Sequence, residues 1–177
     1  MMPILKGPRG APVVGVAGWK KSGKTTLVER LVAEFTHRGL RVSTVKHAHH
    51  DFQIDDGATD SARHRRAGAA QVAIVSSDRW AIVNELRDAP EPSLQDVLGK
   101  LEPCDLVLVE GYKAAPISKI EARRREGHAG RPLAEGDPNV IAIASDHEFA
   151  DSNVPRLALD DISAIADFIL KTVGPRR

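Results

Sequence analysis

Apolar and polar positions along the chain follow two different periods, which predict strands and helices in alternation. Short apolar runs, several of them rich in β-branched residues, are typical of strands buried on both faces of a parallel sheet. We expect strands of this kind at residues 13–17, 41–46, 105–110, 117–122 and 140–144. Stretches with apolar residues three and four positions apart lie between several of them and predict amphipathic helices. The fold expected from this order is α/β, with a mostly parallel central sheet flanked by helices.

Capping and stop residues bound the expected helices. The first helix ends at Gly39 and buries a face formed by Leu27, Val28, Leu31, Val32 and Phe35. A short helix covers residues 61–67, and a third begins at Ser93, which is spaced from Asp96 as in a capping box. The last helix begins near residues 160–161 and buries Ile162, Ile165, Ile169 and Val173.

Two segments depart from this alternation of parallel strands and helices. Residues 71–76 and 80–85 are two strand-like runs joined by a short polar turn, which predicts a hairpin, and we expect Trp80 to pack against a neighbour. Residues 123–138 are polar, charged and rich in Gly and Pro. A loop of that length without secondary structure is usually functional or mobile.

Length and charge limit the function classes. A chain of 177 residues predicts a single domain over residues 1–177, with residues 1–11 as a loose lead-in. The net charge of +1 gives no broad electrostatic case for nucleic acid or a membrane surface as partner. No apolar run reaches the length of a membrane span, and no signal-peptide pattern opens the sequence. Cys104 is the single cysteine, so we expect no disulfide framework and a cytoplasmic location.

The first expected strand leads into the pattern G-x-x-x-x-G-K-[ST] at residues 18–25, which we call the phosphate-loop motif. Glycines allow consecutive backbone N–H groups to turn inward as an anion-binding nest, and the following helix N-terminus adds further N–H donors. Lys24 is expected to reach the β- and γ-phosphates, and the Thr25 hydroxyl to bind Mg²⁺. The expected phosphate-binding residues are Gly18, Trp19, Lys20, Lys21, Ser22, Gly23, Lys24, Thr25 and Thr26.

Three acidic residues lie at or after the carboxyl ends of expected strands, where α/β sheets bind ligands. Glu110 is expected to face Mg²⁺ or its water, and Asp51 is a candidate switch residue. Asp146 is a candidate for base recognition, because a carboxylate accepts from both N1–H and the 2-amino group of guanine. The alternatives are a carboxylate that only ends a strand, a solvated loop acid, and a turn or helix cap, respectively.

A histidine cluster admits two interpretations. His47, His49 and His50 are candidates, with Lys113, for contact with a phosphate or another anionic ligand such as a pterin. The same histidines, with Asp51, also form a candidate metal site. The basic runs at 63–66 and 123–125 are expected to be solvated faces.

Several blocks together resemble the molybdopterin-guanine dinucleotide biosynthesis protein B (MobB) family. They are the loop at 18–26, Lys-His-Ala-His-His-Asp at 46–51, Val-Glu-Gly-Tyr-Lys at 109–113, and the apolar run ending in Ser-Asp at 140–146. The resemblance implies a P-loop NTPase fold, a homodimer, and binding of GTP with Mg²⁺. It also implies weak GTP hydrolysis. The implied partner is the MobA-type guanylyltransferase that attaches GMP to molybdopterin, and molybdopterin itself is a possible ligand.

We therefore expect a GTP-binding adaptor of molybdenum cofactor biosynthesis that is at most a slow GTPase. Its reacting groups would be Lys24, Asp51 and Glu110, and we find no obvious glutamine or cis arginine finger to speed hydrolysis. One alternative is a metallochaperone GTPase that uses His47, His49 and His50. Another is a small-molecule kinase with residues 123–138 as its lid.

Overall fold

The computed structural model describes residues 5–48, 54–55, 57–127, 130–148 and 152–174. Contacts within the chain divide it into two compact units, Met1–His47 with Ser93–Arg177 and Ala48–Pro92. We describe each unit by itself. That the whole chain acts as a single domain stays a prediction.

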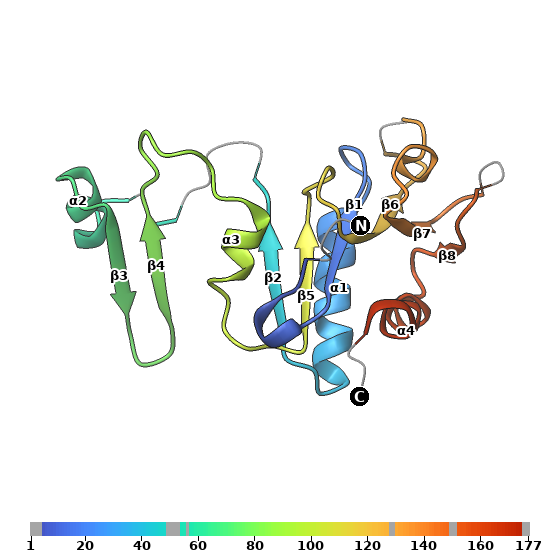
Figure 1. Ribbon diagram of the computed structural model, residues 1–177, viewed down its shortest axis with the longest axis horizontal. Coiled ribbons are helices and arrows are strands. Elements are labelled where there is room, and N and C mark those ends of the chain that lie inside the picture. Colours follow the sequence, from blue (N-terminus) through green and yellow to red (C-terminus); the bar gives the residue numbers. More distant parts are fainter. Residues whose placement is uncertain (1–4, 49–53, 56, 128–129, 149–151, 175–177) are drawn as a thin grey trace. The chain divides into compact units, whose positions relative to one another are not determined.

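The larger unit is built on a six-stranded sheet with the order β2-β5-β1-β6-β7-β8, and each neighbouring pair is parallel (Figure 1). This confirms the expected α/β fold. Parallel strands bring their carboxyl ends to one edge, so the segments after β1, β5, β6 and β7 meet there. The strands are β1 Val13–Ala17, β2 Val42–Lys46, β5 Leu106–Glu110, β6 Ser118–Arg123, β7 Val140–Ser145 and β8 Arg156–Ala158.

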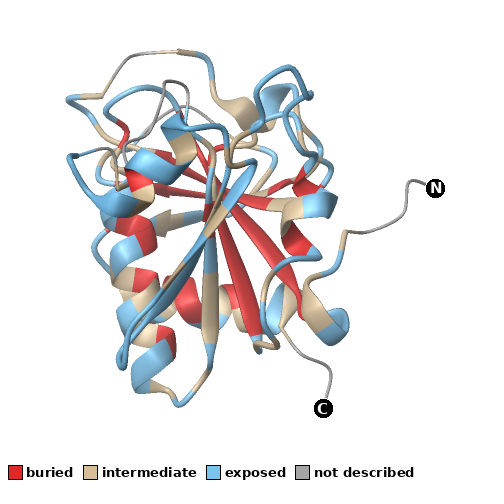
Figure 2. Cartoon of the chain, turned by 90° about the vertical axis from the view of Figure 1, so that its left-hand side faces the viewer, coloured by how far each residue is buried: buried red, intermediate tan, exposed pale blue. Residues whose placement is uncertain are grey.

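Alternate residues of the central strands pack on opposite faces of the sheet. Val14 and Val16 of β1 belong to a core cluster with α1 (Lys24–His37) and α4 (Ile162–Val173). Val13 belongs to a second cluster with the short helix α3 (Leu94–Leu98). Helices therefore cover both faces, and the central strands are buried between them (Figure 2). Two 3₁₀ turns, η1 (Pro8–Gly10) and η2 (Leu133–Glu135), complete the unit.

The smaller unit contains α2 (Asp60–Arg66) and the predicted hairpin of β3 (Gln71–Val75) and β4 (Trp80–Asn84). The strands pair antiparallel, with Val75 opposite Trp80. The expectation that Trp80 packs against a neighbour is wrong, because the residue is 61% exposed. Within the described residues, no helix has the length and apolar character needed to cross a membrane.

Buried charges fix the segment after β6 to the sheet. Lys119 is 1% exposed, and its Nζ lies 2.6 Å from Oδ2 of Asp137. Glu121 is fully buried and accepts hydrogen bonds from Arg123 and from the backbone N–H of Ala134. The segment expected to lack secondary structure therefore contains η2 and is held by two charged side chains of one strand.

Replacing Asp137 with Ala is expected to lower the free energy of unfolding by about 3–5 kcal/mol, because the Lys119 charge is then buried without its partner. The double replacement Lys119→Met/Asp137→Ala is expected to recover most of this loss, since an apolar side chain takes the place of the buried charge. Urea unfolding measures both. A loss under about 1 kcal/mol, the value of a surface pair, would contradict the prediction.

The same ion pair predicts an acid dependence. Burial opposes ionisation of Asp137, but hydrogen bonds from Lys119 and Asn139 outweigh it and hold the pKa below its ordinary value, which is about 3.9. This contribution to stability is therefore fully present above that ordinary pKa and is lost as pH falls through the lower folded-state pKa. Urea unfolding at a series of pH values measures the difference in unfolding free energy between wild type and Asp137→Asn. This difference is expected to shrink as pH falls from the ordinary pKa of an aspartate through the lower folded-state pKa of Asp137.

Candidate functional site

The phosphate-loop motif has the expected strand–loop–helix setting, between β1 and α1. Gly18 and Gly23 both have positive φ, +149° and +87°. A methyl group at Gly18 would lie 2.4 Å from Oγ of Ser22 and 2.5 Å from the carbonyl oxygen of Ala122. Only glycine fits that position, so the first glycine of the motif is required by packing as well as by conformation.

The N-terminus of α1 has no side-chain cap at its N-cap residue. Its N-cap residue is Gly23, which has no side chain to accept a hydrogen bond, and its first turn contains no acidic residue. The other three helices of the described chain are each capped by a side chain, from Thr59, Ser93 and Asp161. The first N–H groups of α1 therefore lack intrahelical acceptors and face an environment that favours an anion.

Cations gather around this helix end. Nζ of Lys24 donates to the carbonyl oxygen of Trp19 at 2.8 Å, and Nζ of Lys113 lies 4.4 Å from the Trp19 ring centroid. Burial lowers the pKa of Lys24, and the positive charges of Lys113 and Lys46 lower it further against the opposing charge of Glu110. The site is therefore short of negative charge, and a bound anion would relieve the repulsion.

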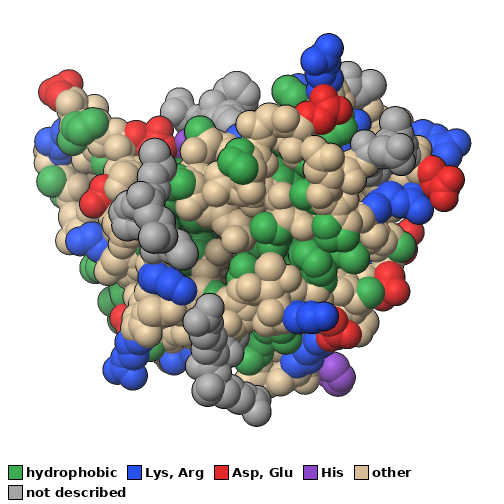
Figure 3. Space-filling model, turned by 45° about the vertical axis from the view of Figure 1, so that its right-hand side comes forward, with side chains coloured by type: hydrophobic (Ala, Val, Ile, Leu, Met, Phe, Trp, Pro, Cys, Tyr) green, Lys and Arg blue, Asp and Glu red, His purple; other side chains and the backbone are tan. Residues whose placement is uncertain are grey.

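This excess of cations is a local feature. On the face shown in Figure 3, Lys and Arg side chains are interspersed with Asp and Glu side chains. The chain as a whole carries a formal net charge of only +1. Attraction for a phosphate would come from the loop and its neighbours and not from a broad basic surface.

Thr25 and Glu110 meet at the carboxyl edge of the sheet. The Thr25 hydroxyl donates to Oε1 of Glu110 at 2.7 Å, and Nζ of Lys46 lies 3.5 Å from the same oxygen. Glu110 reaches this place because β5 is hydrogen-bonded to β1, with Val16 opposite Glu110. A hydroxyl and a carboxylate are hard oxygen donors of the kind Mg²⁺ binds, so these residues fit the expected metal.

The end of β2 lies beside this edge. His47 donates its backbone N–H to the carbonyl oxygen of Glu110, and its ring centroid is 4.7 Å from that of Tyr112. A methyl group at Gly111 would lie 3.1 Å from Cβ of His47, so this glycine allows the two strand ends to approach. The candidates His49, His50 and Asp51 lie outside the described residues. The described residues contain no group of three or more His, Cys, Asp or Glu side chains placed to hold a metal ion.

Asp146 follows β7 at the same edge. Its Oδ1 accepts the backbone N–H of Arg125 at 2.9 Å and lies 2.7 Å from Nδ1 of His147. The hydrogen bond with His147 holds the pKa of Asp146 below its ordinary value, and the Arg125 N–H adds to this effect. The carboxylate is thus ionised at neutral pH.

Three consecutive arginines have three different surroundings, although the sequence suggested one solvated face. Arg123 donates to Glu121 and to the carbonyl oxygen of Gly130. Arg124 lies against the phosphate-loop motif, because a methyl group at Gly23 would be 2.6 Å from its Nε. Arg125 is exposed. The strand period distinguishes alternate residues, but only the tertiary structure shows which loop each side chain meets.

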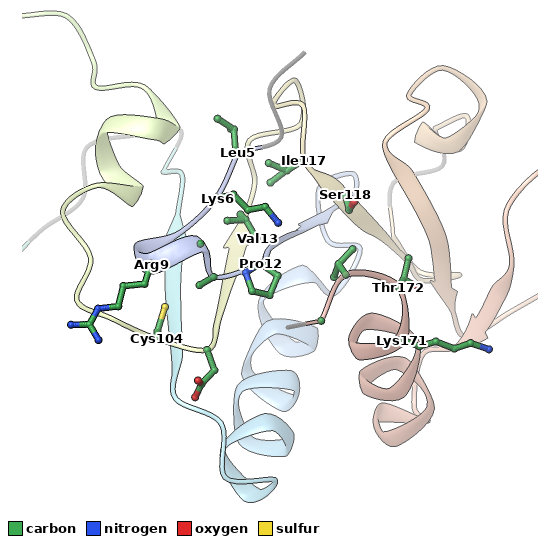
Figure 4. Close-up of a pocket in the computed structure, with 15 residues that line it drawn as sticks. Leu5, Lys6, Arg9, Pro12, Val13, Cys104, Ile117, Ser118, Lys171 and Thr172 are labelled. Atoms are coloured by element: carbon green, nitrogen blue, oxygen red, sulfur yellow. The ribbon is translucent and has the colours of Figure 1, made fainter. Parts of the chain in front are cut away.

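A cavity of about 890 Å³ lies at the opposite edge of the sheet, where β1, β5 and β6 begin (Figure 4). Lys6, Val13, Cys104, Ile117 and Thr172 are among its lining residues. The side chains of Arg9 and Lys171 extend outward from its two sides (Figure 4). Residues 1–4 and 175–177, which continue the chain beyond its lining, lie outside the described residues, so we assign it no role.

Comparison with known proteins places the chain in a family. The sequence profile of the family "Molybdopterin guanine dinucleotide synthesis protein B" (MobB) matches residues 13–146. The chain belongs to the MobB family. The match runs from the first residue of β1 to Asp146, so it includes the phosphate-loop motif, Glu110 and the end of β7.

Two relatives and one solved structure agree with the MobB assignment. A molybdopterin-guanine dinucleotide biosynthesis adapter protein from Haemophilus influenzae is 42% identical over 163 residues, 89% of this chain and 87% of the relative. The Escherichia coli protein of the same name is 37% identical over 170 residues, 94% and 96% of the two chains. A MobB homolog from Bacillus stearothermophilus superimposes with a TM-score of 0.65 at 28% identity, over 90% of this chain and 95% of that one. The resemblance and the expected P-loop NTPase fold are confirmed.

Proposed function

We propose that this MobB-family chain is a GTP-binding adapter in the biosynthesis of molybdopterin guanine dinucleotide. The observation that carries the proposal is the uncapped N-terminus of α1, enclosed by the glycines of the phosphate-loop motif and by Lys24. The adapter role comes from the names of the relatives in Haemophilus influenzae and Escherichia coli. The phosphate-binding role is supported by the geometry of the loop.

The phosphates of GTP would lie in the loop formed by residues 18–26. The backbone N–H groups of the first turn of α1 would donate to them, and Lys24 would exchange the carbonyl oxygen of Trp19 for phosphate oxygens. Thr25 and Glu110 would hold Mg²⁺, which neutralises phosphate charge when bound. Lys113, beside Trp19, and His47, beside Tyr112, are the described candidates for contact with a further anionic ligand such as molybdopterin.

The base would lie on the side of β1 away from the metal. Glu110 is on β5, to one side of β1, whereas Asp146 follows β7, two strands to the other side. A nucleotide with its phosphates in the loop therefore has its base directed along the ends of β6 and β7. Asp146 is ionised there. Guanine offers two donors to a carboxylate and adenine offers none in the same place, which favours GTP.

Hydrolysis by this site would be slow. Lys24 and Mg²⁺ would stabilise phosphate charge, but no glutamine is among the residues we place around the loop to orient an attacking water. Asp51, the other predicted reacting group, lies outside the described residues and stays a prediction. The adapter would therefore depend on whether a nucleotide is bound to it, and not on rapid hydrolysis of that nucleotide.

The proposed partner is the MobA-type guanylyltransferase, with the chain acting as a homodimer in the cytoplasm. Val75, Trp80 and Ile82 are exposed apolar residues on the β3–β4 hairpin, and such a surface supports contact with another protein. No described group of side chains favours the metallochaperone alternative, whose residues His49 and His50 lie outside the described residues.

Calorimetric titration with GTP, ATP and ITP, each with Mg²⁺, tests the nucleotide proposal. We expect GTP to bind about 10- to 100-fold more tightly than ATP, from hydrogen bonds to a charged carboxylate. ITP, which lacks the 2-amino group, is expected to fall between them. Asp146→Asn should lose this preference and keep its affinity for ATP, and Glu110→Gln should lose the gain in affinity from Mg²⁺.

Asp78→Asn, which changes an exposed aspartate of the smaller unit, is the matched control and is expected to bind like wild type. Equal affinities of wild type for GTP and ATP would refute the role of Asp146. Absence of binding to all three nucleotides would refute the nucleotide proposal as a whole.

Co-purification with the guanylyltransferase tests the adapter proposal. Wild type is expected to retain the transferase, and more of it when GTP and Mg²⁺ are present. Lys24→Ala is expected to retain the basal amount with no response to GTP, because it lacks the phosphate contact but keeps the fold. A wild-type chain that retains no transferase under either condition would contradict the proposed partner.

A further inference from the structure

Arg124 lies against the phosphate-loop motif from the side of β6. A methyl group at Gly23 would be 2.6 Å from Nε of Arg124 and 3.2 Å from its Cδ and Cζ, so the guanidinium covers the Cα of this glycine. Gly23 is the N-cap of α1. The residue after β6 therefore places a positive charge at the helix end where the proposed function places phosphates.

Neighbouring contacts fix this arrangement. The Trp19 ring donates its N–H to the carbonyl oxygen of Arg131 at 3.0 Å, and a methyl group at Gly130 would touch the same ring. A methyl group at Gly127 would lie 3.2 Å from the carbonyl oxygen of Lys21. The segment after β6 thus packs on the loop at several points, and Arg124 is part of that contact.

The charge of Arg124 is uncompensated at this place. A cation near the N-terminus of a helix is repelled by the helix dipole, and Lys24 of the same helix adds further repulsion. Within the described parts of the chain, no carboxylate or carbonyl group is paired with the Arg124 guanidinium. Its neighbour Arg123, by contrast, donates to buried Glu121. Arg124 therefore lacks the internal partner that would explain a purely structural role.

We propose that Arg124 binds the α- and β-phosphates of the nucleotide, from the side opposite Mg²⁺. This inference rests on the proposed function. β5, which carries Glu110, and β6, which ends beside Arg124, flank β1 on its two sides. Mg²⁺ at Thr25 and Glu110 would therefore compensate the phosphates from one side, and the guanidinium of Arg124 would do so from the other.

This position predicts a distinct pattern of affinities. Arg124 contacts phosphates that GDP, GTP and inorganic pyrophosphate share in the loop, and it lies away from the metal. Its removal should therefore weaken all three ligands by a similar factor, about 10- to 100-fold for a lost hydrogen bond between charged groups. The preference for GTP over ATP should not change, because Asp146 is untouched.

The test is titration of wild type, Arg124→Gln, Arg124→Lys and Arg125→Ala with GDP, GTP, ATP and pyrophosphate. Arg124→Gln should show the uniform loss, and Arg124→Lys should recover part of it because it keeps the charge. Arg125→Ala is the matched control, since it removes an exposed guanidinium and keeps the backbone N–H that Asp146 accepts. Thermal unfolding of each variant without ligand separates a folding defect from a binding defect.

The outcomes separate the two proposals. If wild type binds GTP and Arg124→Gln binds all four ligands within about twofold of wild type, the role of Arg124 is refuted while the nucleotide proposal stands. A loss for GTP and GDP without a loss for pyrophosphate would place Arg124 at the base or ribose, and would also refute it. Failure of wild type to bind any of the four ligands would refute the nucleotide proposal and this inference together.

Discussion

The uncapped N-terminus of α1 is the constraint on which the rest of this molecule depends. This 14-residue helix begins at the carboxyl edge of a parallel sheet. Its N-cap residue has no side chain to accept a hydrogen bond from the N–H groups of its first turn. Gly18 and Gly23 supply the positive φ angles of the loop that precedes the helix, and Lys24 adds charge. Without an anion this end is electrostatically unfavourable, which is why a phosphate ligand is the simplest explanation for it.

The order of the strands then places different kinds of side chain on the two sides of that helix end. β5 brings a carboxylate beside Thr25, which gives a side suited to a metal ion. β6 brings Arg124, and β7 brings an ionised Asp146, which give a side suited to phosphate and base. Lys119 and Glu121 anchor the segment between β6 and β7 through buried polar contacts, and so hold the second side in shape. This segment therefore contributes to stability and carries residues of the proposed binding site.

Much of this arrangement follows from local sequence. Apolar runs marked five of the parallel strands, the Ser93–Asp96 spacing marked the capping box of α3, and the glycine pattern marked the loop. That Glu110 meets Thr25 was predictable because parallel strands end at one edge of a sheet. The MobB resemblance extended the prediction from a phosphate loop to a family.

The features that escaped prediction depend on contacts distant in sequence. β8 has only three residues and no apolar run, so its sequence does not mark it as a strand. Its extended conformation is recognised only from its pairing with β7. The burial of Lys119 depends on Asp137, 18 residues later, and the position of Arg124 depends on a loop a hundred residues earlier. Trp80 was expected to pack, but a two-stranded hairpin leaves much of its side-chain surface exposed, and periodicity does not show which residues stay exposed.

The most direct test of the central claim is to follow backbone amide resonances by NMR while GDP and Mg²⁺ are added to the labelled protein. If the N-terminus of α1 binds phosphate, the largest shifts fall on residues 20–26, and they disappear in Lys24→Ala. Shifts confined to another part of the chain, with the amides of Lys24 and Thr25 unchanged, would contradict the account.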